Sequence, residues 1–162
     1  MRGLTRATLH LGLGLALGLP LLGCGGVDGG GQPLTGLEAD THALVNQERE
    51  AEGLPGLAWE AAIADEARGH SQDMASGSVE FGHDGFDARV ARLAESLPWS
   101  AAGENVAYNQ GYPDPPAQAV EGWMDSTGHR ENILGDFHRT GIGVAGSEAT
   151  GYHFTQIFLR DP

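Results

Sequence analysis

The sequence predicts an α+β fold in which helices flank a small, mainly antiparallel sheet. Apolar residues recur at helical spacing from about residue 40 to residue 124, whereas β-branched and aromatic residues concentrate between residues 142 and 159. The last of these segments carries apolar side chains on both of its faces, so neither face of the sheet can be left to solvent. We therefore expect helices on both sides of the sheet.

The chain has the length of one ordinary domain and a strongly acidic composition. It contains 162 residues, of which 40% are hydrophobic, and domains of ~100 to 150 residues are the usual unit of folding. Its 22 acidic residues outnumber 9 basic ones, all of them arginine, and the formal net charge is -13. Such a surface repels phosphate backbones, so we expect no nucleic-acid partner.

The first 23 residues are predicted to be an export signal. Arg2 and Arg6 precede an apolar stretch, residues 11–22, that is about half of the ~20 residues needed to cross a bilayer. The stretch ends at Leu21-Leu22-Gly23-Cys24 and resembles the processing signal of bacterial lipoproteins, in which the cysteine receives lipid. Cys24 is the only cysteine. The alternative is an ordinary secretory signal followed by a free thiol.

Residues 24–36 are expected to form a lipidated cysteine and a glycine-rich tether. A flexible chain of this length reaches ~20 Å, which would hold a domain just off a membrane surface. The folded domain is then expected at residues 37–162. These interpretations together predict an exported protein, anchored to the membrane at Cys24 and facing the periplasm or the cell exterior.

The first two helices are predicted from caps and apolar spacing. The first should begin with Asp40 or Thr41 as its cap and end at Gly53. The second follows Trp59 and should end near Gly77. Its apolar stripe consists of Ile63, Ala67, His70 and Met74. We therefore interpret His70 as a core histidine that donates to the backbone.

Two further helices and the strands follow. A short helix should begin at the cap Asp87, and a longer one should begin at Pro115. Within the longer helix, Gly122 predicts a close backbone approach, because glycine costs ~1 kcal/mol there relative to alanine. Strands are expected at residues 104–108, around residues 142–144 and at residues 152–159, the last two as a hairpin. In the last strand, Phe154 and Phe158 should face one way, and Ile157 and Leu159 the other.

Six segments of this domain carry a family resemblance. They are Leu44-Val45-Asn46, Gly53-Leu54, Leu57-Ala58-Trp59, His70-Ser71-Gln72-Asp73-Met74, Gly103-Glu104-Asn105-Val106-Ala107 and the run from Trp123 to Leu134. The last two strands add Thr140–Val144 and Phe154–Phe158. In this order the segments resemble the bacterial branch of the CAP superfamily, also called the SCP or Tpx-1/Ag5/PR-1/Sc7 family. The resemblance implies an α-β-α sandwich.

The resemblance also implies a cleft with two histidines and two acidic residues, which in some members bind divalent cations. Carried over by position, the histidines are His83 and His129 and the first carboxylate is Glu104. Where animal and plant members have the second acidic residue, this chain has Ser126, with Asp125 beside it as the alternative carboxylate. The resemblance therefore predicts a site for Zn2+, Mg2+ or Ca2+.

Two neutral imidazoles and a carboxylate suit such an ion, because they can hold it at ~2.0 to 2.2 Å and leave a position open. The separations of 21 and 25 residues mean that only the tertiary fold can bring them together. Glu104 could instead cap a turn, and His129 could cap a helix. Ser126, Arg130 and Asn132 are expected to support the site by hydrogen-bonding the surrounding loops.

No segment matches a nucleophile elbow, a His-Glu-x-x-His zinc motif, a phosphate loop or a dinucleotide fingerprint. The first interpretation is therefore a non-enzymatic module that binds a divalent cation and a small-molecule, lipid or peptide ligand. A metal-dependent hydrolase or protease is the second, with Glu104, Ser126 and His129 as candidate catalytic residues. The third is an acidic surface adhesion domain without a working site.

Overall fold

The computed structural model describes residues 36–162. The expected signal peptide at residues 1–23, the lipidation at Cys24 and the tether up to residue 35 lie outside the described residues. The elements are α1 (Gly36–Ala51), β1 (Ala58–Trp59), α2 (Ala61–Ser76), α3 (Phe86–Leu93), β2 (Ala101–Asn109), α4 (Pro115–Asp125), α5 (Thr127–Ile133), β3 (Arg139–Ser147) and β4 (Gly151–Arg160). From residue 36 onward, no helix has the length and hydrophobicity to cross a bilayer.

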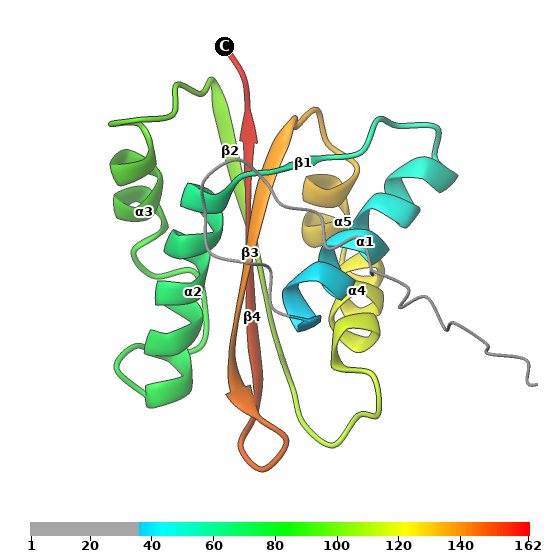
Figure 1. Cartoon of the computed structure of the whole chain (residues 1–162), viewed down its shortest axis with the longest axis vertical. Helices are drawn as coiled ribbons and strands as arrows, with labels where there is room; N and C mark the ends of the chain where they lie inside the picture. Colours follow the sequence, from blue (N-terminus) through cyan, green and yellow to red (C-terminus); the bar gives the residue numbers. More distant parts are fainter. Residues whose placement is uncertain (1–35) are drawn as a thin grey trace, which may run out of the picture.

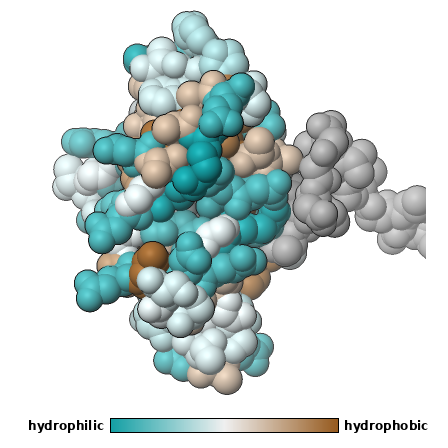
Figure 2. Space-filling model, turned by 90° about the vertical axis from the view of Figure 1, so that its left-hand side faces the viewer, coloured by the Kyte–Doolittle hydropathy of each residue, from teal (hydrophilic) through white to brown (hydrophobic). Residues whose placement is uncertain are grey.

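The elements form three layers. The sheet has the strand order β1-β3-β4-β2, with β1 parallel to β3 and the other pairs antiparallel. Helices α2 and α3 cover one face, and α1, α4 and α5 cover the other (Figure 1). The outer surface on the side of α2 and α3 is mostly hydrophilic (Figure 2). The predicted α+β sandwich with a mainly antiparallel sheet is confirmed.

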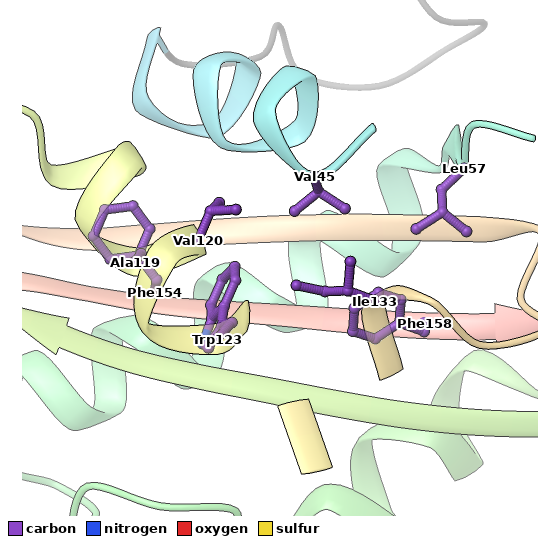
Figure 3. Close-up of a cluster of buried hydrophobic side chains, with 8 residues drawn as sticks. All are labelled: Val45, Leu57, Ala119, Val120, Trp123, Ile133, Phe154 and Phe158. Carbon is purple, nitrogen blue, oxygen red and sulfur yellow. The ribbon is translucent and has the colours of Figure 1, made fainter. Parts of the chain in front are cut away.

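The alternation of side chains along β4 divides the core into two parts. Phe154 and Phe158 pack with Trp123 and other residues of α1 and α4 in one cluster (Figure 3). Ile157 and Leu159 pack on the other face against residues of α2 and α3. Both faces of the central strand are therefore covered, as the sequence predicts.

Helix α2 lies in direct backbone contact with β3. A Cβ atom at Gly141 would come within 2.1 Å of Ala64 N, and one at Gly143 would come within 2.1 Å of Arg68 N. Ser71 of α2 donates from Oγ to Gly143 O at 2.9 Å, which fixes the helix over this position. Only glycine permits so close an approach at both positions.

Two helices begin earlier than predicted. Helix α1 begins at Gly36, so Asp40 and Thr41 are not its caps, and Thr41 Oγ1 donates to Leu37 O inside the helix at 2.6 Å. The extra turn places Glu38 in a buried ion pair with Arg68, 2.8 Å away, which spacing rules cannot detect. Helix α3 begins at Phe86 rather than at Asp87, because Gly85 adopts φ 79° and precedes it.

The structure differs from the sequence predictions at three other places, namely α5, β1 and Gly122. The two-residue strand β1 is not among the predicted elements. Helix α5 begins at Thr127, so His129 lies inside this helix and is not its cap. Strand β1 is held on its partner by Ala58 N, which donates to His138 O at 2.8 Å. The close approach expected at Gly122 is wrong, because nothing lies within 4 Å of a Cβ built there.

Arg49 joins the end of α1 to the segment after α5. It is 1% exposed, and its guanidinium donates to Pro55 O at 2.8 Å, Ile133 O at 2.7 Å and Gly135 O at 2.8 Å. Burial lowers the pKa of Arg49, an effect that Asp136 partly opposes. The arginine thereby donates to the last carbonyl of α5 and to a carbonyl just beyond the helix, groups that have no partner within α5.

Candidate functional site

The predicted site residues meet at β2, the strand at one edge of the sheet. Side chains of the neighbouring helices cover the free side of this strand. Trp123 Nε1 of α4 donates to Val106 O at 3.0 Å, and Asn132 Nδ2 of α5 donates to Glu104 O at 3.2 Å. These bonds satisfy edge carbonyls that would otherwise accept from water or from another chain.

Hydrogen bonds of Asn105 and Asn132 join the Gly-Glu-Asn segment of β2, residues 103–105, to helix α5 in an interlock. Asn132 Nδ2 also donates to Asn105 Oδ1 at 2.9 Å, and Asn105 Nδ2 donates to His129 O at 3.1 Å. A Cβ at Gly103 would lie 2.8 Å from Asn132 Oδ1, so glycine leaves room for the asparagine. This interlock holds His129 beside Glu104, although the two residues belong to different layers.

Glu104 is buried and its carboxylate is fully engaged. Arg89 of α3 donates from Nε to Oε2 at 3.0 Å and from Nη2 to Oε1 at 2.9 Å and to Oε2 at 2.7 Å. His83 Nδ1 lies 3.0 Å from Oε1. Arg89 is 5% and Glu104 6% exposed, so this ion pair is largely shielded from water.

Arg89 is the functional residue that the sequence prediction missed. It lies on the inward face of α3 with Val90 and Leu93, where the apolar spacing of a short helix gives no sign of a buried charge. Its Nη1 also donates to Asp84 O at 2.8 Å, which ties it to the loop that carries His83. Arg89 therefore connects α3, this loop and β2.

The loop before α3 is also held from the side of α2. His70 is buried, as predicted, and its Nε2 lies 2.8 Å from Gly82 O. The adjacent His83 has half of its side chain exposed. His70 thus supports the backbone next to His83.

The two histidines of the site face each other from opposite layers. The ring centroids of His83 and His129 are 6.1 Å apart, and the ring planes are inclined by 49°. Burial, together with the nearby His83, lowers the pKa of His129, which favours its neutral form. When His83 is neutral, a proton on Nδ1 donates to Glu104 and leaves the lone pair on Nε2.

Three further predicted residues, Asp125, Ser126 and Arg130, lie at the junction of α4 and α5 and within α5. Asp125 is an exposed residue at the end of α4, and within residues 36–162 no group of three His, Cys, Asp or Glu side chains is arranged to hold a metal ion. Ser126 separates α4 from α5, and its side chain makes no capping hydrogen bond. The half-exposed guanidinium of Arg130 lies 4.0 Å from Glu52 of the chain after α1, and the supporting role expected of Arg130 stays a prediction.

The structure therefore brings together His83, Glu104, His129 and Arg89, which we call the two-histidine site. The carboxylate orients one imidazole, the arginine neutralises the carboxylate, and the second imidazole is kept uncharged. In their neutral forms the two imidazoles offer one nitrogen lone pair each to a ligand, and the charges of Arg89 and Glu104 cancel.

Comparisons with known proteins agree with this architecture. The model of the Cysteine-rich secretory protein family (CAP) matches residues 42–158. The "Uncharacterized membrane protein YlbC" of Bacillus subtilis (strain 168) is 39% identical over 121 residues, which are 72% of this chain and 32% of that protein. The "Uncharacterized protein YkwD" of the same organism is 34% identical over 123 residues, 72% of this chain and 44% of that protein.

A solved structure of a protein with an SCP domain is also similar to this chain. An extracellular protein containing a SCP domain from Bacillus anthracis str. Ames superposes with a TM-score of 0.66 at 34% identity, over 78% of this chain and 41% of that chain. The chain thus spans less than half the length of each of these relatives. Because the family model covers most of the sequence, the chain belongs to the CAP family, the cysteine-rich secretory protein family.

Proposed function

We propose that this protein is an exported, non-enzymatic CAP module that binds a divalent cation between His83 and His129 and offers the bound ion to a ligand. The observation that carries the proposal is the pair of imidazoles 6.1 Å apart, one of them oriented by a buried carboxylate. An ion held by two protein ligands keeps further positions open, so a ligand can coordinate there.

The two rings are about one ångström farther apart than two imidazoles that bind the same small transition-metal ion. Two imidazoles bound to Zn2+ at ~2.0 to 2.1 Å in tetrahedral geometry have ring centroids ~5 Å apart. The separation of 6.1 Å is wider by about one ångström. His83 can close this gap, because half of its side chain is exposed.

The hydrogen bond of His83 and the burial of His129 also support cation binding. A ligand histidine commonly donates its other ring N–H to a carboxylate, as His83 does to Glu104. His129 must be uncharged to bind an ion, and burial already lowers its pKa. Neither imidazole therefore needs a large change in its surroundings before it can act as a ligand.

A binding role fits the site better than hydrolysis does. A general base must have a free oxygen within reach of the proton that it removes. Both oxygens of Glu104 accept hydrogen bonds from Arg89, and one also faces His83. Glu104 is thus unsuited to act as the base, and Ser126 makes no hydrogen bond to a described histidine.

Export and membrane attachment are part of the same proposal. The relative from B. anthracis is an extracellular protein, and the sequence before the domain resembles a lipoprotein signal that ends at Cys24. We propose that lipid on Cys24 holds the acidic domain at the outer surface of a membrane.

Replacing Cys24 with serine should move the protein from the detergent phase to the aqueous phase in a detergent-partitioning experiment, because the variant cannot receive lipid at this position. A variant that stayed in the detergent phase would contradict the anchor.

Calorimetric titration of Zn2+ into the full chain tests the cation site. We expect saturable binding by the unchanged protein and its loss in a variant with both His83→Ala and His129→Ala. The exposed His138, replaced by alanine, serves as the control and should leave binding unchanged. Equal binding by the double variant would show that the ion does not bind at the two-histidine site.

A further inference from the structure

We propose that Arg89 makes the two-histidine site selective for cations that prefer imidazole nitrogen, such as Zn2+, Cu2+ and Ni2+, and closes it to Ca2+ and Mg2+. This inference rests on the proposed cation binding and names the class of ion. It follows from the way in which Arg89 occupies Glu104, the carboxylate of the site.

Three donor nitrogens surround the carboxylate of Glu104, namely Arg89 Nε, Arg89 Nη2 and His83 Nδ1. A carboxylate offers about four lone-pair positions, two on each oxygen. Oε1 faces Arg89 Nη2 at 2.9 Å and His83 Nδ1 at 3.0 Å. Oε2 accepts from Arg89 Nη2 at 2.7 Å and from Arg89 Nε at 3.0 Å. An ion that bound to this carboxylate would have to displace one of these donors.

Arg89 is also a permanent positive charge at this position. Its guanidinium does not lose its proton in proteins, and it neutralises the negative charge that would otherwise attract a hard cation. The pair is buried, so water screens the repulsion between the guanidinium and a second cation poorly. Arg89 thus occupies the place beside Glu104 that a bound ion would take.

The guanidinium is fixed in place by the surrounding fold. Arg89 Nη1 donates to Asp84 O at 2.8 Å, and a Cβ at Gly85 would lie 3.3 Å from the same nitrogen. Gly85 has φ 79°, a conformation that favours glycine. Glycine at position 85 thus leaves room for the guanidinium, and the bond to Asp84 O holds it beside the carboxylate.

What remains for a cation is the pair of imidazoles. Ca2+ requires six to eight oxygen ligands, and Mg2+ binds oxygen in octahedral geometry. Imidazole nitrogen instead suits Zn2+, Cu2+ and Ni2+. With both oxygens of Glu104 engaged by Arg89, His83 and His129 supply nitrogen alone, which predicts the selectivity.

Calorimetry on the full chain can test the role of Arg89. The unchanged protein is titrated with Zn2+, Ni2+, Ca2+ and Mg2+ in parallel with an Arg89→Gln variant. We expect the unchanged protein to bind Ca2+ and Mg2+ at least a hundredfold more weakly than Zn2+. The variant should bind Ca2+ at least tenfold more tightly than the unchanged protein, and adding Glu104→Gln should remove this gain.

Arg92→Gln is the matched control. Arg92 lies on the same helix but is exposed and pairs with Glu66 at 2.6 Å, so its loss should leave the selectivity unchanged. Circular dichroism establishes which variants fold. Should Arg89→Gln not fold, the series on the unchanged protein decides: preference for Zn2+ supports the inference, and comparable Ca2+ binding that requires the two histidines overturns it.

The outcomes separate this inference from the proposed function. A folded Arg89→Gln variant that gains no Ca2+ binding overturns the role of Arg89, whatever Zn2+ does. If the unchanged protein binds no ion but the variant gains Ca2+, Arg89 is shown to block the site and the proposed cation binding is wrong. If neither protein binds any ion, both proposals are wrong.

Discussion

Gly122 and Gly143 show how differently one residue type can act in this molecule. Gly122 lies in α4 with open space around it, so replacement by alanine should raise the free energy of unfolding by ~1 kcal/mol through helix propensity. Gly143 lies against α2, and a Cβ there would come within 2.1 Å of Arg68 N. The same replacement at Gly143 forces helix and strand apart and should lower that free energy by ~3 kcal/mol or more.

Urea unfolding of the two alanine variants measures both effects, and each variant is the control for the other. The prediction is that the two replacements change the free energy of unfolding in opposite directions. A destabilised Gly122→Ala variant would mean that α4 is more tightly packed than described. A neutral Gly143→Ala variant would mean that α2 can move away from β3 at little cost.

At the same scale, the sequence predicts three of the four members of the two-histidine site. His83, Glu104 and His129 follow from their places in family motifs, and the structure brings them together. Arg89 could not be found in this way, because an arginine on a short helix is usually exposed. Its burial depends on Glu104, which lies in a different element, and only the tertiary structure reveals the pair.

Among the elements, those with strong local signals were predictable. Helix α4 has Asp114 as its cap, whose Oδ1 accepts from Ala117 N at 3.1 Å, and Pro115 at its start. Helix α2 ends at Gly77 with φ 74°, as a left-handed glycine cap predicts. The hairpin of β3 and β4 likewise follows from alternating apolar residues on either side of a glycine-bounded turn.

The elements that could not be predicted depend on distant partners. The first turn of α1 is held by Glu38, which is paired with Arg68 of α2 and accepts from Val144 N of β3 at 3.3 Å. Helix α5 is short and polar, and its place is set by bonds from Asn132 to β2. Tertiary contacts thus decide these boundaries, where local propensity is weak.

The same contacts protect both edges of the sheet. Glu38 accepts from Val144 N on the side of β3 that the two-residue strand β1 leaves unpaired beyond Thr140. Asn132 and Trp123 donate to carbonyls along β2. Unpaired edge strands invite pairing with other chains. Asn132, which also bonds Asn105 beside the two-histidine site, and Trp123 therefore limit the association of this domain through the edge of β2.

For the molecule as a whole, stability should fall as the pH drops below about 6.5, the ordinary pKa of histidine. Burial lowers the pKa of His129, with a further contribution from the nearby His83, and burial alone lowers that of His153. Between the lowered pKa of the folded chain and the higher pKa of the unfolded chain, the unfolded chain binds more protons. The free energy of unfolding must therefore decrease with falling pH in this window and level off below the folded pKa.

Urea unfolding at several pH values from 7.5 to 5 in the presence of a chelator, which removes any contribution of bound metal, measures this loss. A variant with both His129→Gln and His153→Gln should lose less stability over the same range, because two groups that take up protons on unfolding are gone. The single variants divide the effect between the two-histidine site and the sheet face that carries His153. If the double variant lost as much stability as the unchanged protein, the acid sensitivity would have to arise at other groups, and the description of His129 as a histidine kept neutral by burial would be wrong.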